Sequence, residues 1–387
     1  MQLPVYMDHN ATTPCDPRVV EAMLPYFTRH FGNAASRTHA YGWEAEEAVD
    51  LARTQVAGLI GAEPKELIFT SGATESCNLA IKGVFEMYAG KGNHIITCVT
   101  EHKAVLDTCK HLEKKGAEIT YLPVDARGMI RLEELEAAIR PTTILIALMY
   151  ANNETGVIHP IRSIGALAKK HGVLFFSDAA QAAGKIPVDV QADGVDLLSI
   201  SAHKLYGPKG VGALYVRRKS PRVKLVQQID GGGHEHGLRS GTLNVPGIAG
   251  FGTACKLAEL EMGSDTERLE KLRDRLENAL LKLEGSFVNG HTINRLPHVT
   301  NISFSYAKGE ALIGALNRTV AISSGSACTS ALPEPSYVLK AMGVDDELAY
   351  SSLRFGLGRS TTAEQVDFVI EQVSKAIKQC ENSSMAQ

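Results

Sequence analysis

Seven short apolar runs, separated by longer amphipathic segments, follow one another between residues 67 and 216. Such runs are typical of buried strands, and their regular alternation with helical segments indicates βαβ units. We therefore predict an α/β fold in which helices cover a seven-stranded, mostly parallel sheet. The runs lie at residues 67–70, 94–98, 118–122, 143–149, 173–177, 197–201 and 211–216.

The pattern changes after about residue 260. Residues 264–267 have the composition of a helix start, and the leucines that follow at helical spacing predict one apolar helix face. Two further strands are predicted at 299–304 and 320–323, and a last helix near 366–377. We predict two domains, a large one of residues 15–260 and a smaller α+β domain that combines residues 1–14 with 261–387.

Charge and composition argue against several classes of protein. The net charge is -3 at pH 7 and no basic run occurs, so nothing indicates direct nucleic-acid binding. No apolar stretch approaches the ~20 residues that cross a bilayer, and the N-terminus lacks a basic segment followed by an apolar one. The seven cysteines are scattered without a Cys-x-x-Cys pair, which predicts reduced thiols. Together these features predict a cytoplasmic protein without a membrane segment.

Two charged residues come at the ends of predicted strands. Asp178 follows the run 173–177, and Lys204 follows the run 197–201 just before the strand-breaking pair Gly207-Pro208. A lone lysine is usually a solvated surface residue, but ligands of parallel sheets bind beyond the carboxyl ends of the strands. An amine and a carboxylate at one crevice are what pyridoxal 5′-phosphate requires, the lysine for covalent attachment and the acid for the pyridine nitrogen.

The segment 71–76, Ser-Gly-Ala-Thr-Glu-Ser, follows a predicted strand and opens a predicted helix. Free backbone N–H groups and the positive end of a helix dipole suit a phosphate, with Thr74 as a hydroxyl donor. Ordinary helix capping by Ser71 or Thr74 accounts for the same residues. Thr242, in Arg-Ser-Gly-Thr, is another candidate phosphate donor.

Three more polar residues are candidates on weaker grounds. His102 follows a strand, where an imidazole can stack on a ring or move protons, although most histidines do neither. Asn153 follows another strand, and asparagine is also an ordinary turn residue. Arg354 can bind a substrate carboxylate through two hydrogen bonds, but one arginine in a strand is a weak signal.

The segment 323–331 contains only Ser, Gly, Ala, Thr and one cysteine, Cys328. Nothing in it can pack a core, so we predict a mobile loop. A cysteine on such a loop is exposed and reactive, which makes Cys328 a candidate nucleophile. The other cysteines lie mostly in apolar or helical surroundings.

Together these motifs resemble the class I cysteine desulfurases of the NifS/IscS type, over residues 3 to 378. Each motif is weak alone, but their combination and order are specific, and the loop that ends at Ser330 marks class I. They are Asn-Ala-Thr-Thr (10–13), Phe-Gly-Asn (31–33), Ser-Gly-Ala-Thr-Glu-Ser (71–76), Glu-His (101–102), Asn-Asn-Glu-Thr-Gly (152–156), Asp-Ala-x-Gln (178–181), His-Lys (203–204), Gly-Gly-Gly-His-Glu (231–235), Arg-Ser-Gly-Thr (239–242) and Ser-Ser-Gly-Ser-Ala-Cys-Thr-Ser (323–330).

The resemblance implies an aspartate-aminotransferase-like homodimer of PLP fold-type I. In it Lys204 holds the cofactor covalently and later moves the substrate Cα proton, while His102 stacks on the cofactor ring and assists proton transfers. Asp178 pairs with the pyridine nitrogen and Gln181 with the ring oxygen. The phosphate ligands implied are Ala73, Thr74, Ser201, His203 and, from the partner subunit, Thr242.

The same resemblance implies the reaction. Asn153 and Arg354 position L-cysteine, and Cys328 takes its sulfur as a persulfide while alanine is released. The persulfide then supplies an iron–sulfur scaffold, a tRNA-thiolation protein or another acceptor. The resemblance also allows Cys328 to ligate a [2Fe–2S] cluster transiently, shared with a scaffold protein.

The sequence departs from the family pattern at a few positions. Ala34 replaces proline, Cys77 replaces Asp or Asn, and His236 replaces arginine. IscS-type enzymes use a longer C-terminal segment to dock the scaffold, whereas here a short polar tail, which we expect to be frayed, follows the last predicted helix. Selenocysteine lyase and aminotransferase remain alternatives, although an aminotransferase has no use for Cys328. A protein that binds partners and holds the cofactor only incidentally is a third.

Overall fold

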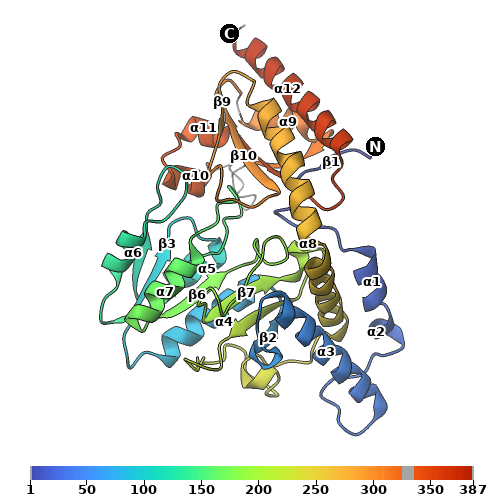
Figure 1. Ribbon diagram of the computed structural model, residues 1–387, viewed down its shortest axis with the longest axis vertical. Coiled ribbons are helices and arrows are strands. Elements are labelled where there is room, and N and C mark those ends of the chain that lie inside the picture. Colours follow the sequence, from blue (N-terminus) through green and yellow to red (C-terminus); the bar gives the residue numbers. More distant parts are fainter. Residues whose placement is uncertain (1, 308, 325–334, 386–387) are drawn as a thin grey trace.

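A twisted seven-stranded sheet forms the centre of the larger part of the molecule (Figure 1). The computed structural model describes residues 2–307, 309–324 and 335–385. The strand order is β2-β8-β7-β6-β5-β3-β4; β8 runs antiparallel to both of its neighbours, and the other neighbouring pairs are parallel. All seven predicted strands are confirmed: β2 Leu67–Thr70, β3 His94–Cys98, β4 Glu118–Leu122, β5 Thr143–Ala147, β6 Leu174–Asp178, β7 Leu197–Ser201 and β8 Gly212–Val216.

Helices cover both faces of this sheet, which explains why the residues of the central strands β3, β5, β7 and β8 are all buried. Successive residues of a strand point to opposite faces, so Ile95 packs in the core beneath α4 and α5, and Ile96 in the core that contains α3 and α8. The helices of this part are α1 Pro17–Met23, α2 Pro25–Thr28, α3 Ala40–Leu59, α4 Ala73–Met87, α5 Lys103–Glu113, α6 Leu132–Ala138 and α7 Ile161–His171, with short 3₁₀ turns at Pro64–Glu66, Ala202–Lys204 and Glu235–Gly237.

A second, smaller layer of strands lies at the other end of the molecule (Figure 1). Its antiparallel sheet has the order β12-β13-β10-β9, and a parallel pair, β1-β11, ties the N-terminus to the C-terminal region. Val5 and Met7 accordingly pack in one core with Leu353 and Phe355. The elements are β1 Val5–Tyr6, β9 Ser286–Val288, β10 Val299–Phe304, β11 Val320–Ala321, β12 Ser323–Ser324, β13 Ser352–Gly356, α9 Gly309–Leu316, α10 Tyr337–Ala341, α11 Asp346–Tyr350 and α12 Ala363–Met385.

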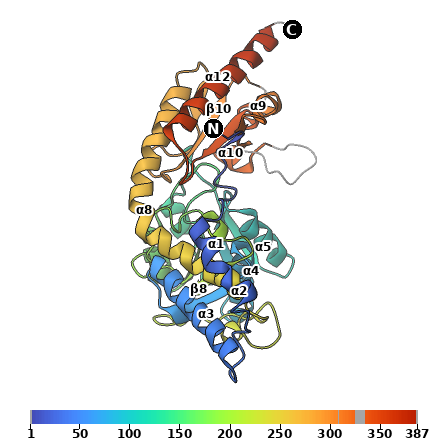
Figure 2. The same cartoon turned by 90° about the vertical axis from the view of Figure 1, so that its right-hand side faces the viewer.

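One long helix, α8 Val245–Leu280, joins the two parts (Figure 2). Its first half buries Phe251 in the core of the large sheet, and its second half buries Leu276 in the core of the small one. The helix start predicted at residues 264–267 is therefore wrong, because apolar packing on both sides holds the chain helical through Gly263 despite a cost of about 1 kcal/mol for glycine. The predicted domain division at residue 260 falls inside this helix and stays a prediction.

The end of the chain also differs from its prediction. The tail from Cys380, expected to be frayed, continues α12 as far as Met385. The apolar face of this helix, with Val366, Val369 and Val373 fully buried, packs in the same core as the small sheet.

Candidate active site

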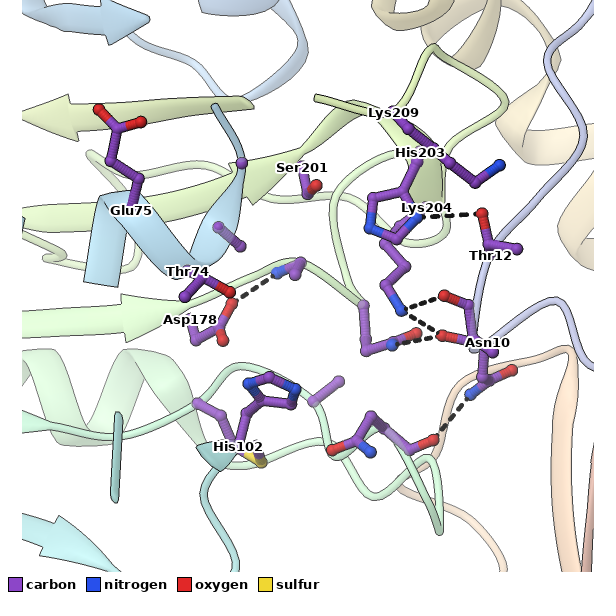
Figure 3. A pocket seen from close by; sticks show the side chains of 18 of the residues that line it. Asn10, Thr12, Thr74, Glu75, His102, Asp178, Ser201, His203, Lys204 and Lys209 are labelled. Carbon is purple, nitrogen blue, oxygen red and sulfur yellow. Dashed lines mark hydrogen bonds between the residues drawn. The ribbon is translucent and has the colours of Figure 1, made fainter. Parts of the chain in front are cut away.

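A pocket of about 660 Å³ opens beyond the carboxyl ends of β6 and β7 and at the N-terminus of α4 (Figure 3). This is the edge of a parallel sheet at which ligands bind. Ten of the twelve predicted site residues line it: Ala73, Thr74, His102, Asn153, Asp178, Gln181, Ser201, His203, Lys204 and Arg354. Cys328 lies outside the described residues, and Thr242 lies outside the described lining of this pocket.

Lys204 ends the 3₁₀ turn that follows β7, and its side chain reaches back across the pocket (Figure 3). The ammonium Nζ donates hydrogen bonds to the backbone oxygens of Asn10 at 2.5 Å and Ala11 at 2.7 Å. Burial, reinforced by the positive charge of Arg354, lowers the pKa of Lys204 to about 8. About one tenth of this amine is therefore neutral, and nucleophilic, at pH 7, far more than for an unperturbed lysine.

Asp178 is the last residue of β6 and is almost fully buried. Its Oδ1 accepts hydrogen bonds from the backbone N–H of Ala180 at 3.0 Å and from the Ser199 hydroxyl at 2.9 Å. Gln181, one turn further on, donates from Nε2 to the backbone oxygen of Asn10 at 3.0 Å. The carboxylate is held in one orientation at the wall of the pocket.

The turn from β2 into α4 forms a cradle for an anion. Gly72 caps α4 with φ of 151°, a conformation that favours glycine, and the first backbone N–H groups of the helix follow it. A Cβ atom on Gly72 would lie 3.7 Å from Ser201 Oγ, so a side chain here would occupy the cradle. The first N–H groups of a helix have no intrahelical partner, and together with the helix dipole they make this end of the pocket suitable for phosphate.

His203 and Lys209 also line the pocket (Figure 3). His203 Nδ1 lies 3.1 Å from the Thr12 hydroxyl. Burial, together with the charges of Lys204 and Lys209, lowers the pKa of His203 to about 4. The imidazole is thus neutral at pH 7, when it can share one hydrogen-bonding proton with an anion without adding charge.

Arg354 lies on β13 of the small sheet and lines the pocket. Its guanidinium donates to Asp8 Oδ1 at 2.7 Å and to the backbone oxygen of Asn153 at 3.1 Å. Arg354 Nε and Asn153 Oδ1 are both buried without a hydrogen-bond partner among the described residues. Buried polar atoms are normally paired, so these two atoms have hydrogen-bonding capacity left for a polar ligand.

His102 lies at the opposite wall of the pocket from Lys204 (Figure 3). It caps α5, and its Nδ1 accepts a hydrogen bond from the backbone N–H of Ala104 at 3.1 Å. This bond fixes the tautomer, since an accepting Nδ1 leaves the proton of a neutral ring on Nε2. The exposed ring is therefore held by its own helix.

Five of the six described cysteines have the properties of unreactive thiols. Burial raises the pKa of Cys15, Cys77, Cys98, Cys109 and Cys255. The thiolate is the nucleophile, so a raised pKa disfavours these groups. No cluster of three metal-ligating side chains occurs within the described residues, which do not include Cys328.

Sequence reasoning missed three residues that shape the pocket. Asn10 supplies the carbonyl that receives Lys204 and Gln181, and Asp8 holds Arg354. Ser199 orients Asp178. Asn10 belongs to a motif that was noted, but its contribution is a backbone atom, which residue type cannot reveal.

Comparison with known proteins agrees with this geometry. Residues 5–369 match the model of the aminotransferase class-V family. A curated cysteine desulfurase IscS from Anaeromyxobacter sp. (strain Fw109-5) is 58% identical over 385 residues, which cover 99% of this chain and 95% of the relative. The chain belongs to the NifS/IscS-type cysteine desulfurases of this family. The predicted family is thereby confirmed.

Solved structures extend the comparison to the fold. A NifS-like protein superposes with a TM-score of 0.90 at 39% identity, covering 97% of this chain and all of its own. SspA, solved in complex with cysteine, has a TM-score of 0.81 at 38% identity and covers 91% of this chain and 98% of its own. The predicted fold-type I architecture is confirmed.

The cofactor of this family is pyridoxal 5′-phosphate, and the residues of the pocket fit it. The Lys204 amine has a lowered pKa, and the buried Asp178 carboxylate lines the same pocket. The N-terminus of α4, where Gly72 has no side chain, lies at one end. Asn10 Oδ1 is a further buried acceptor without a partner among the described residues. These are the groups that an aldehyde, a protonated ring nitrogen and a phosphate require.

Proposed function

We propose that this cysteine desulfurase binds its cofactor and L-cysteine in the pocket around Lys204 and passes the substrate sulfur to Cys328. The observation that carries the proposal is that Lys204, Asp178 and Arg354 line one pocket. Asp178 would pair with the ring nitrogen and Gln181 with the ring oxygen, while His102 would stack on the ring. Ala73, Thr74, Ser201 and His203 would hold the phosphate.

Pyridoxal phosphate acts as an electron sink that weakens the bonds at the Cα and Cβ atoms of an amino acid. Lys204, with a pKa of about 8, is suited both to take the Cα proton and to return it. Arg354 would exchange Asp8 for the substrate carboxylate, aided by Asn153. The Cys328 thiolate then attacks the substrate sulfur: the C–S bond breaks, an S–S bond forms, and the carbon product leaves as alanine after protonation at Cβ.

The overall reaction balances as one thiol and one cysteine giving one persulfide and one alanine. The direct test is to add L-cysteine and a thiol reductant to the cofactor-loaded protein and to quantify alanine and sulfide together. We expect equal amounts. Alanine without sulfide, or turnover of other amino acids in preference to cysteine, would contradict the proposal.

The lowered pKa of Lys204 predicts how cofactor loading depends on pH. Only the neutral amine attacks an aldehyde, and with a pKa near 8 its fraction rises from about one tenth at pH 7 to about nine tenths at pH 9. Loading of the apoprotein should therefore accelerate with pH up to about 9 and then level off. Stopped-flow absorbance measures the rate, and the same aldehyde with Nα-acetyl-lysine corrects for its own titration. A rate that still rises about sevenfold between pH 9 and 10 would mean an unperturbed lysine.

An exposed apolar surface supports the proposal that the enzyme is a homodimer. Leu24, Phe27, Phe31, Tyr41 and Trp43, around α1, α2 and the start of α3, are each more than half exposed, and the rings of Phe31 and Tyr41 lie 5.3 Å apart. Apolar patches of this kind mark interaction sites. Thr242, exposed and outside its own pocket, is then available to the partner's phosphate site.

Sedimentation equilibrium tests the dimer. We expect a mass twice the 41.6 kDa of one chain, and Trp43→Glu should shift the mass towards one chain because it places a charge in the buried interface. Leu260→Glu, at an exposed leucine of α8 that lies outside the patch, is the control and should leave the mass unchanged. A single-chain mass for the wild type would contradict the dimer.

We further propose that the Cys328 persulfide serves an iron–sulfur scaffold or another sulfur-acceptor protein in the cytoplasm, with Cys328 as a transient ligand of a [2Fe–2S] cluster shared with the scaffold. The relationship to IscS supports this assignment. Within the described residues, every helix is too short or too polar to span a bilayer.

A further inference from the structure

A buried hydroxyl lies directly behind Asp178, away from the open pocket. Ser199 is fully buried on β7 and pairs with Asp178 across the parallel ladder, so the two side chains project from neighbouring strands on the same face. The Ser199 hydroxyl donates to Asp178 Oδ1 at 2.9 Å. The backbone N–H of Ala180 donates to the same oxygen at 3.0 Å. Oδ1 is therefore fully engaged by two fixed donors.

The other carboxylate oxygen has a different environment. The Cys77 thiol, fully buried on α4, lies 3.8 Å from Asp178 Oδ2 and 3.5 Å from the Ser199 hydroxyl. A thiol is a weak donor, and among the residues the structure describes no N–H or O–H group donates to Oδ2. One oxygen is thus fixed by the protein while the other keeps its capacity to accept a strong hydrogen bond.

We propose that Ser199 is a positioning residue, whose hydroxyl fixes Asp178 through Oδ1 and leaves Oδ2 as the acceptor for the protonated ring nitrogen of the cofactor. The inference rests on the proposed role of Asp178. A hydrogen bond to a buried carboxylate restricts its rotation and directs its free lone pairs, so a group that never touches the cofactor sets the geometry of the one that does.

The test compares two ligands that differ at one ring position. Ser199→Ala apoprotein is titrated with pyridoxal phosphate and with the analogue whose ring nitrogen is replaced by C–H, following absorbance. We expect the affinity for pyridoxal phosphate to fall by about tenfold or more, as for loss of a hydrogen bond to a charged group, and the affinity for the analogue to stay within about twofold. A purely structural role would weaken both ligands equally, and that result would overturn the proposal.

Ser177 provides a matched control. It is fully buried on β6, next to Asp178 in sequence, and its hydroxyl finds no partner among the described residues. Ser177→Ala removes the same atom at the same depth without touching Asp178, so both affinities should be unchanged. If Ser199→Ala does not fold, Ser199→Cys keeps a side chain of similar size with a weaker donor, and pyridoxal phosphate alone should lose affinity. Unchanged affinity of a folded Ser199 variant for pyridoxal phosphate would also overturn the proposal.

The experiment also separates this inference from the proposed role of its neighbour. Asp178→Asn should bind pyridoxal phosphate far more weakly than the wild type does. It should bind the analogue with the same affinity as the wild type. If Asp178→Asn discriminates the two ligands and Ser199→Ala does not, the positioning role of Ser199 is wrong. If Asp178→Asn itself fails to discriminate them, the pairing of Asp178 with the ring nitrogen is wrong instead.

Discussion

Lys204→Ala is expected to lower alanine production from L-cysteine by about 10⁴-fold, because one amine supplies both covalent attachment and proton transfer. The variant should nevertheless fold as stably as the wild type. The low pKa of about 8 shows that the folded protein disfavours the charged form of this amine, so its removal relieves a cost of burial. Alanine quantification measures the activity, and a thermal unfolding curve measures the stability.

Lys209→Ala is the matched control for this prediction. Lys209 carries the same charge and lines the same pocket, but it is exposed and belongs to the loop after Pro208. An exposed cation contributes little through charge alone, so we expect less than a fivefold loss of activity, about the size of one surface ion pair. Comparable losses in the two variants would mean that Lys204 acts only as a positive charge.

The sheet could be predicted from the sequence because its information is local. Strands buried on both faces are mostly apolar runs, and each of the seven strands could be predicted from its own residues. The continuity of helix α8 could not be predicted, since Gly263-Ser264 is a local signal for a break. That signal is overridden by packing against two separate cores, whose positions depend on the whole fold.

In the candidate site, too, some residues could be predicted from local sequence, whereas other contacts depend on the whole fold. Asp178 and Lys204 were identified because each follows a strand, and the topology of a parallel sheet brings strand ends together. The pairing of Asp8 with Arg354 joins residues 346 positions apart, and neither segment contains a sequence signal that predicts the pair. The bond from Ser199 to Asp178 depends on the register of two strands, which a sequence pattern leaves undetermined.

Cys328→Ala should abolish the reaction at a later step than Lys204→Ala does. With no thiolate to accept sulfur, we expect alanine and sulfide production to fall by at least about 100-fold, the low end of what loss of one essential side chain does to turnover. The pocket residues are intact in this variant, so cofactor absorbance and its change on adding L-cysteine should be those of the wild type. Simultaneous absorbance and alanine measurements distinguish a protein that binds but cannot transfer from one that cannot bind.

The interpretation of that result depends on whether another cysteine of the chain could accept the sulfur in place of Cys328. Cys15, which is partly buried, has a pKa raised by burial and then by the negative charge of Asp16, so Cys15→Ala should leave turnover unchanged. The four buried cysteines with raised pKa values are equally poor thiolates. If Cys328→Ala kept more than a tenth of the activity and the additional change Cys380→Ala did not lower it further, sulfur would have to pass directly from substrate to an external thiol. In that case no persulfide would form on the wild-type chain. Mass spectrometry of the cysteine-treated protein measures this.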